Sequence, residues 1–160
     1  MDGTVLIQRA ERYIKYSNER RLEAMFRMFR PDSTYQDSQQ GTYVGLQRIA
    51  AMTRAFFGEF PACSWEVERY DLVTPDTVAF SFEMVGERAG TSCSVARSGT
   101  RRLTFDNTGR IVRIEVDLEN EIELDSDEQG SGVGAAEDHG ADIPVDDDND
   151  ADLVAELFDD

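Results

Sequence analysis

Apolar residues recur with a helical period over the first part of the chain. Residues 4–18 gather their apolar side chains on one side of a helical wheel, with Tyr13 near its centre and charged side chains away from it. The same spacing predicts a short helix at residues 20–29, which Pro31 ends because proline cannot continue a helix. A third helix is predicted at residues 46–57. Its inward positions are Leu46, Ile49, Ala50, Thr53, Phe56 and Phe57.

The period changes to two in the second half of the chain, as expected of β-strands. Residues 77–85 alternate most clearly, and strands are also predicted near 91–105 and 112–118. In the stretch 64–73 the inward phase slips, which indicates a strand with a bulge. A short strand at 33–36 precedes the third helix. The pattern predicts an α+β fold, with three N-terminal helices packed on one face of a curved antiparallel sheet.

Charge divides the chain near residue 120. Residues 1–120 contain all 16 Lys and Arg and 17 of the 33 Asp and Glu, whereas residues 121–160 contain the remaining acids and no base. A segment with so much like charge and few large apolar residues cannot bury enough surface to offset its chain entropy. We therefore predict one domain at 1–120 and a disordered acidic tail at 121–160.

Composition also narrows the classes of function. The acidic balance argues against nucleic-acid binding, because phosphates would be repelled. No long apolar run indicates a signal peptide or a membrane span, and Cys63 and Cys93 fit reduced thiols, so we predict an intracellular protein, cytoplasmic or nuclear. The one histidine, His139, lies in the tail and leaves no Cys/His cluster for zinc. We expect no metal and no cofactor.

The end of the tail differs from the rest of it. Leu153, Val154, Leu157 and Phe158 are spaced as on one side of a helix and are surrounded by acids. This segment fits an amphipathic helix that docks on a basic protein partner, and it equally fits a solubilising end with a few incidental apolar residues.

Several short stretches, in this order and spacing, resemble one superfamily. They are Tyr13 in the first helix, TYQD at 34–37, YVG at 43–45 and FDNTGRIVRIEVD at 105–117. Together with the order of elements, they resemble the NTF2-like superfamily, and within it the SnoaL-like polyketide cyclase and ketosteroid isomerase relatives, over residues 4–119. The resemblance implies a cone of helices against a bent sheet, a pocket inside it, and frequent dimerisation through the open sheet face.

The resemblance also implies roles for two residues. In ketosteroid isomerases a tyrosine on the first helix donates a hydrogen bond to an oxyanion, and an aspartate after the first short strand is the general base. Tyr13 and Asp37 occupy these positions, so they are the predicted catalytic residues. From the residues alone, Tyr13 also fits a core aromatic, and Asp37 also fits a surface turn residue that caps its own backbone.

Arg101 departs from the isomerase pattern. The isomerases have a protonated aspartate at the matching position, whereas arginine carries a permanent charge. Arg101 shares the inward phase of Leu103 and Phe105, unless a bulge turns it outward. A buried charge needs a partner, and Asp37 is a candidate. Such a pair suits the binding of a polar or anionic ligand better than proton abstraction.

The sequence leads to two functional hypotheses. The first is an apolar pocket that binds a small organic ligand, with isomerase- or cyclase-type acid–base chemistry if the protein is an enzyme. The second is a non-catalytic interaction module that uses the sheet face, as a homodimer, and the acidic tail. Asp117 falls on the outward phase, so we do not expect it in the pocket. The residues predicted to contact the ligand are Asp37, Tyr13, Arg101, Tyr35, Trp65 and Phe56, of which Tyr35 and Trp65 fit core packing equally well.

Overall fold

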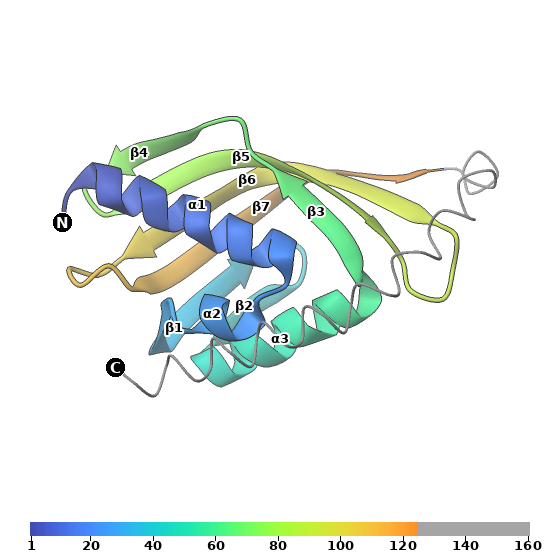
Figure 1. Ribbon diagram of the computed structural model, residues 1–160, viewed down its shortest axis with the longest axis horizontal. Helices are drawn as coiled ribbons and strands as arrows, with labels where there is room; N and C mark the ends of the chain where they lie inside the picture. Colours follow the sequence, from blue (N-terminus) through green and yellow to red (C-terminus); the bar gives the residue numbers. More distant parts are fainter. Residues whose placement is uncertain (125–160) are drawn as a thin grey trace.

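The computed structural model describes residues 1–124, and they form three helices and seven strands (Figure 1). All strands belong to one curved sheet in the order β2-β1-β7-β6-β5-β3, with β4 also pairing with β5. This confirms the predicted α+β architecture of helices packed on a curved sheet. The elements are α1 (Gly3–Glu19), α2 (Leu22–Phe26), β1 (Phe29–Asp37), β2 (Gly41–Val44), α3 (Leu46–Glu59), β3 (Ala62–Glu66), β4 (Tyr70–Thr74), β5 (Thr77–Glu87), β6 (Ser94–Phe105) and β7 (Ile111–Leu124).

Helix α1 lies across the sheet against β3, β4 and β5, whereas α3 packs against β1 and β2, and α2 packs against α1 (Figure 1). Asp2 caps the start of α1 by accepting a hydrogen bond from the backbone N–H of Thr4 at 3.0 Å. Arg20 ends the helix in the left-handed conformation, with φ 55°. The buried face of α1 is the predicted one: Leu6, Ala10, Tyr13, Ile14 and Ser17.

The second helix is shorter than predicted, because Phe29 already belongs to β1 and Pro31 lies inside that strand. Ser33 stabilises this local irregularity. Its Oγ accepts a hydrogen bond from the N–H of Arg30 at 2.9 Å and donates one to the carbonyl oxygen of Ile111 at 2.6 Å. The register of β1 against β7 shifts at this point, which accommodates a proline that has no N–H for the ladder.

Strand β1 makes the sheet mixed, whereas the prediction was an antiparallel sheet. It pairs antiparallel with β2 in a hairpin that closes at Asp37 and Gly41, and it pairs parallel with β7. Two parallel strands need a long connection between them, and here the connection consists of all the elements from β2 to β6. Strand β2 itself was not predicted, since Gly41 at its start and Gly45 just after it indicate a turn.

The stretch 64–73 forms parts of two strands, which corrects the prediction of one bulged strand. Strands β3 and β4 both pair antiparallel with β5, β3 along residues 83–87 and β4 along residues 77–80. The phase slip therefore marks the point where the chain leaves one end of β5 and joins the other.

A bend in β6 occurs at Gly99. The register between β6 and β7 shifts between Ser98 and Gly99, and a Cβ on Gly99 would lie 2.2 Å from the carbonyl oxygen of Asp117. Only glycine fits so close to a neighbouring backbone. Arg97 and Arg101, on either side of the bend, both contribute to the inner surface described below.

Strand β7 continues to Leu124, beyond the predicted domain end at residue 120. Glu121 pairs with Arg97 at 3.2 Å, and Ile122 lies opposite Ala96. Residues 121–124 are thus part of the sheet. Their backbone pairs with that of β6, and an arginine on that strand offsets part of their negative charge. The other predictions for the tail, including its disorder, His139 and the amphipathic segment at 153–158, lie outside the described residues.

Candidate functional site

A cavity of about 620 Å³ lies on the inner side of the sheet, bounded by α1, α3 and β1. Exposed residues among its lining, such as Gln40, Arg48 and Ala51, place its mouth between the β1–β2 turn and α3. The structure brings together every residue predicted to contact a ligand. The cavity lining includes Asp37, Tyr13, Arg101, Tyr35, Trp65 and Phe56.

The walls of the cavity are largely aromatic. The ring of Trp65 lies 5.6 Å from that of Phe56 and 5.8 Å from that of Phe57, measured between centroids. Phe82 and Met84 of β5 add further apolar surface. Trp65 and Tyr35 are buried in the core and also line the cavity. The two interpretations of these residues, as core packing and as pocket walls, are therefore compatible.

Asn18 holds Trp65 in place, although no pattern in the sequence singles it out. Its Nδ2 donates to the carbonyl oxygen of Trp65 at 3.0 Å, and its Oδ1 accepts from the backbone N–H of the same residue at 2.7 Å. The two bonds join the end of α1 to β3. An asparagine near a helix end carries no signal that identifies a partner so distant in sequence.

Arg101 is the only charged side chain among the buried residues of the described chain, with 6 % of its surface exposed. This confirms its predicted inward phase. Its guanidinium lies 5.2 Å from the ring centroid of Phe82 and 5.9 Å from that of Tyr13, within the range of cation–π attraction. Its Nε is fully buried and has no hydrogen-bond partner within residues 1–124.

The direct ion pair proposed between Arg101 and Asp37 is not formed in the described part of the chain. Burial by itself lowers the pKa of Arg101, but Tyr35, Tyr13 and Asp37 outweigh it and raise the pKa above its ordinary value. Arg101 is therefore a cation at neutral pH. The negative charge of Asp37 acts on it through space rather than by contact.

Asp37 is half-buried at the end of β1 and has the features of both predicted alternatives. Its Oδ1 accepts hydrogen bonds from the backbone N–H groups of Gln39 at 2.8 Å and Gln40 at 3.1 Å, as expected of a turn aspartate. The same carboxylate lines the cavity, near its mouth. A carboxylate oriented by backbone donors at the edge of a cavity can accept a proton from a molecule inside it.

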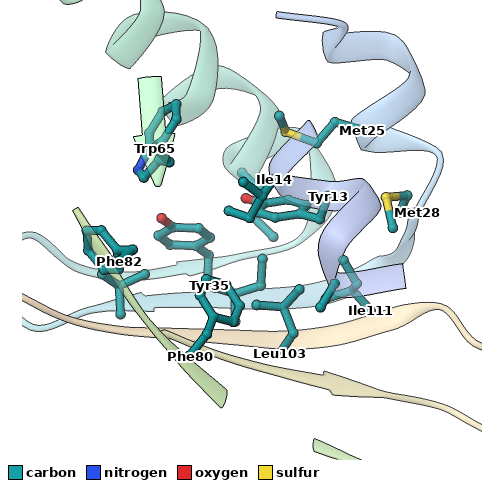
Figure 2. Close-up of a cluster of buried hydrophobic side chains, with 14 of the residues drawn as sticks. Tyr13, Ile14, Met25, Met28, Tyr35, Trp65, Phe80, Phe82, Leu103 and Ile111 are labelled. Atoms are coloured by element: carbon teal, nitrogen blue, oxygen red, sulfur yellow. The ribbon is translucent and has the colours of Figure 1, made fainter. Parts of the chain in front are cut away.

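Tyr13 and Tyr35 present hydroxyl groups to the cavity from opposite sides. Burial raises the pKa of both phenols above the ordinary 10.0, and the charge of Arg101 opposes this only in part. Both are thus protonated donors at neutral pH. Their hydroxyl oxygens point toward the side of the cluster on which Trp65 lies (Figure 2). Neither makes a hydrogen bond to another described residue.

The remaining charged residues of the lining have partners or face solvent. Arg97 pairs with Glu121 and lies over the ring of Phe60, and Glu59 pairs with Arg88. Residues 1–124 contain no group of three or more His, Cys, Asp or Glu side chains that could hold a metal ion. They also contain no helix long and apolar enough to cross a membrane.

Three residues outside the cavity behave as the sequence predicts. Asp117 of β7 is exposed, on the outward phase of its strand. Cys63 and Cys93 are free thiols, and burial raises the pKa of Cys63 to about 12, so its unreactive thiol form persists at neutral pH.

Comparison with solved structures identifies the fold. The chain is 14% identical to the epoxide hydrolase/cyclase-like enzyme SalBIII of pyran ring formation in polyether salinomycin, over 74% of this chain and 93% of that one, with a TM-score of 0.67. A putative SnoaL-like polyketide cyclase from Jannaschia sp. CCS1 is 14% identical over 72% and 86% of the two chains, with a TM-score of 0.62.

An NTF2-like protein of unknown function from Exiguobacterium sp. 255-15 is similar over 69% of this chain and 98% of that one, at 16% identity and a TM-score of 0.62. A search of curated proteins found no match. In sequence, residues 10–114 match the family described as SnoaL-like domain. That range includes residues 10–19 of α1, the Asp37 turn and the strand that carries Arg101. The chain therefore belongs to the SnoaL-like domain family.

Proposed function

We propose that this chain binds a small organic molecule in the cavity and transfers a proton on it. The observation that carries the proposal is the convergence of three donors without described acceptors, Arg101, Tyr13 and Tyr35, on a cavity with otherwise mostly apolar walls. A cavity of about 620 Å³ is within the size range of sites for small organic ligands. An apolar site with a few convergent polar groups is the usual form of such a site.

The proposed chemistry divides the polar groups into two roles. Asp37, near the mouth, is the base that removes a proton from carbon or from a hydroxyl group. Arg101 and Tyr13 stabilise the negative charge that then develops on a ligand oxygen. Donors fixed in advance in a site that excludes water are most effective for this purpose. The cyclase and the epoxide hydrolase/cyclase-like enzyme among the similar folds support this class of reaction by analogy only.

A test of the chemistry is hydrogen–deuterium exchange at acidic C–H bonds. We expect the full chain to accelerate exchange of the α-hydrogens of 2-tetralone in D₂O, followed by NMR. Replacing Asp37 by asparagine should slow this exchange by roughly 100-fold or more, the usual contribution of a general base, while binding of the ketone is retained. Asp117→Asn is the matched control, because this aspartate is exposed and lies outside the lining.

Two results would count against the proposal. Exchange that is unchanged in Asp37→Asn would show that Asp37 is not the base. Absence of saturable binding of any organic probe to the full chain would remove the ligand-binding function itself.

A second candidate, an interaction module, is favoured by one observation on the outer face of the sheet. Val85, Ala96 and Ile122 lie side by side on β5, β6 and β7, and Val85 and Ile122 are 49% and 56% exposed. This row fits the predicted homodimer through the sheet face. Light scattering tests it: a dimer that becomes a monomer in Ile122→Glu supports this function, and a monomeric native chain contradicts it. The basic partner proposed for the acidic tail requires a separate test, in which binding disappears when residues 125–160 are removed.

A further inference from the structure

We propose that the cavity selects an organic monocarboxylate, with its carboxylate bound to the guanidinium of Arg101 and its apolar part against the aromatic walls. This inference rests on the proposed ligand-binding function and names the class of ligand. It does not depend on the proton-transfer step. It follows from four features of the described residues.

The first feature is a buried positive charge without a compensating negative charge in contact. Arg101 is 6 % exposed, and its Nε has no hydrogen-bond partner in the described chain. The rings of Tyr13 and Phe82 lie near its guanidinium, and they attract a cation but accept no conventional hydrogen bond. Buried guanidinium groups in proteins normally pair with a carboxylate, because an isolated buried charge is costly. A ligand carboxylate would supply the missing partner.

The second feature is the geometry of the free edge. The N–H groups along one edge of an arginine guanidinium form a planar fork that matches the two oxygens of a carboxylate. Nε of Arg101 is fully buried, so the free edge is the one between the two Nη groups, for which residues 1–124 show no acceptor. The hydroxyl groups of Tyr13 and Tyr35, which lie in the same cavity, can donate to the same oxygens.

The third feature is that the chain's own nearby carboxylates are held elsewhere. The Oδ1 of Asp37 accepts two backbone hydrogen bonds in its turn. Glu59 pairs with Arg88, and Glu121 pairs with Arg97. The positive charge of Arg101, deep in the cavity, is therefore not neutralised by a carboxylate of the described chain. An incoming anion does not have to displace an existing ion pair.

The fourth feature is the composition of the remaining walls, which limits the ligand to one charged group. Phe56, Phe57, Phe82 and Met84 offer no hydrogen bonds to a second carboxylate or to a phosphate, and Trp65 offers only its indole N–H. Of the other two arginines in the lining, Arg97 is paired with Glu121, and Arg48 is exposed at the mouth. A dianion or a sugar phosphate would leave charged or hydroxyl groups unpaired against apolar surface. An aromatic or aliphatic monocarboxylate leaves none.

The experiment compares carboxylates with their own primary amides. Isothermal titration calorimetry of the full chain would use three pairs, 2-naphthoate, 4-phenylbutyrate and decanoate, each with the corresponding amide. The amide has nearly the same shape and lacks the charge. We expect at least one carboxylate to bind roughly 30-fold or more tightly than its amide, as for a charge pair desolvated in an interface.

Variants then assign the preference to Arg101. In Arg101→Met the carboxylate should bind no more tightly than the amide, whereas Arg101→Lys, which keeps the charge without the planar fork, should retain part of the preference. Arg102→Met is the matched control: it removes the same charge from the adjacent, exposed position on β6, so the preference should be unchanged. Circular dichroism of each variant verifies folding, and the carboxylate–amide comparison in the native chain stands even if a variant does not fold.

The outcomes separate this inference from the proposed function. Amides that bind as tightly as their carboxylates, or a preference that persists in a folded Arg101→Met, would overturn the inference and leave the ligand-binding function intact. Absence of binding by both members of every pair, together with absence of binding by 2-tetralone, would overturn both.

Discussion

Replacing Arg101 by methionine should make the ligand-free protein more stable. Methionine has a similar length and no charge, and Phe82 and Tyr13 provide an apolar surface for it. The substitution removes a buried N–H that has no described acceptor, and such a group costs about 1–3 kcal/mol. It also removes two cation–π contacts, which stabilise by about 2 kcal/mol each when they are buried. The desolvation cost of a buried charge is itself several kcal/mol, so the balance of the three effects predicts a net gain of about 1 kcal/mol.

Urea unfolding, followed by the fluorescence of the single tryptophan, measures this gain directly. The midpoint should rise with an unchanged slope, and the melting temperature should rise by roughly 4 °C or more. Arg102→Met is the control and should change stability by less than about 0.5 kcal/mol, as surface substitutions usually do. A loss of more than about 1 kcal/mol in Arg101→Met would refute the reasoning, because it would show that the native chain already satisfies this charge.

Three further predictions concern the frame of the cavity and its tyrosines. Gly99→Ala places a Cβ against a backbone carbonyl oxygen on β7, so it should destabilise the protein by about 1–3 kcal/mol in urea unfolding; an unchanged midpoint would show that the bend can relax. Asn18→Ala removes both hydrogen bonds to Trp65 and should cost about 1–3 kcal/mol, with a red shift of tryptophan fluorescence that an undisturbed wall would not show. Burial raises the pKa of Tyr13 and Tyr35 above the ordinary 10.0, so their contribution to stability is complete below pH 10 and decreases as the pH rises above it. The unfolding free energy should therefore fall as the pH rises above about 10, less steeply in Tyr13→Phe, and an equal slope in that variant would contradict the assignment.

The sequence was sufficient to predict the features that depend on local periodicity. The buried face of α1, the inward phase of Arg101 and the outward position of Asp117 follow from side-chain spacing alone. The order of short motifs led to the prediction that Tyr13 and Asp37 share a pocket, and both residues line the cavity. These predictions succeeded because spacing along one element determines the face of that element.

The features that depend on partners distant in sequence were not predictable. Phe29 fits the apolar face of a helix as well as a strand, and only its place beside β7 decides between them. The contact of Asn18 with Trp65 joins two elements that no pattern connects. Glu121 resembles a tail acid until Arg97 is found opposite it on β6.

The relation between Asp37 and Arg101 shows the same limit. Opposite charges on the inner phases of two strands suggest a direct pair, but the distance between them depends on the curvature of the whole sheet. In the described chain the aspartate accepts hydrogen bonds from its own turn, and the guanidinium of the arginine lies near aromatic rings and forms no ion pair. The separation of these two charges is what gives the cavity an unpaired cation.

A crystal structure of the full chain with a bound aromatic monocarboxylate tests this account most directly. The account predicts both carboxylate oxygens at about 2.7–2.9 Å from the two Nη atoms of Arg101, with the ring against Trp65 and Phe56. A ligand carboxylate held at the mouth by Arg48, with the guanidinium of Arg101 paired instead to Asp37, would contradict it.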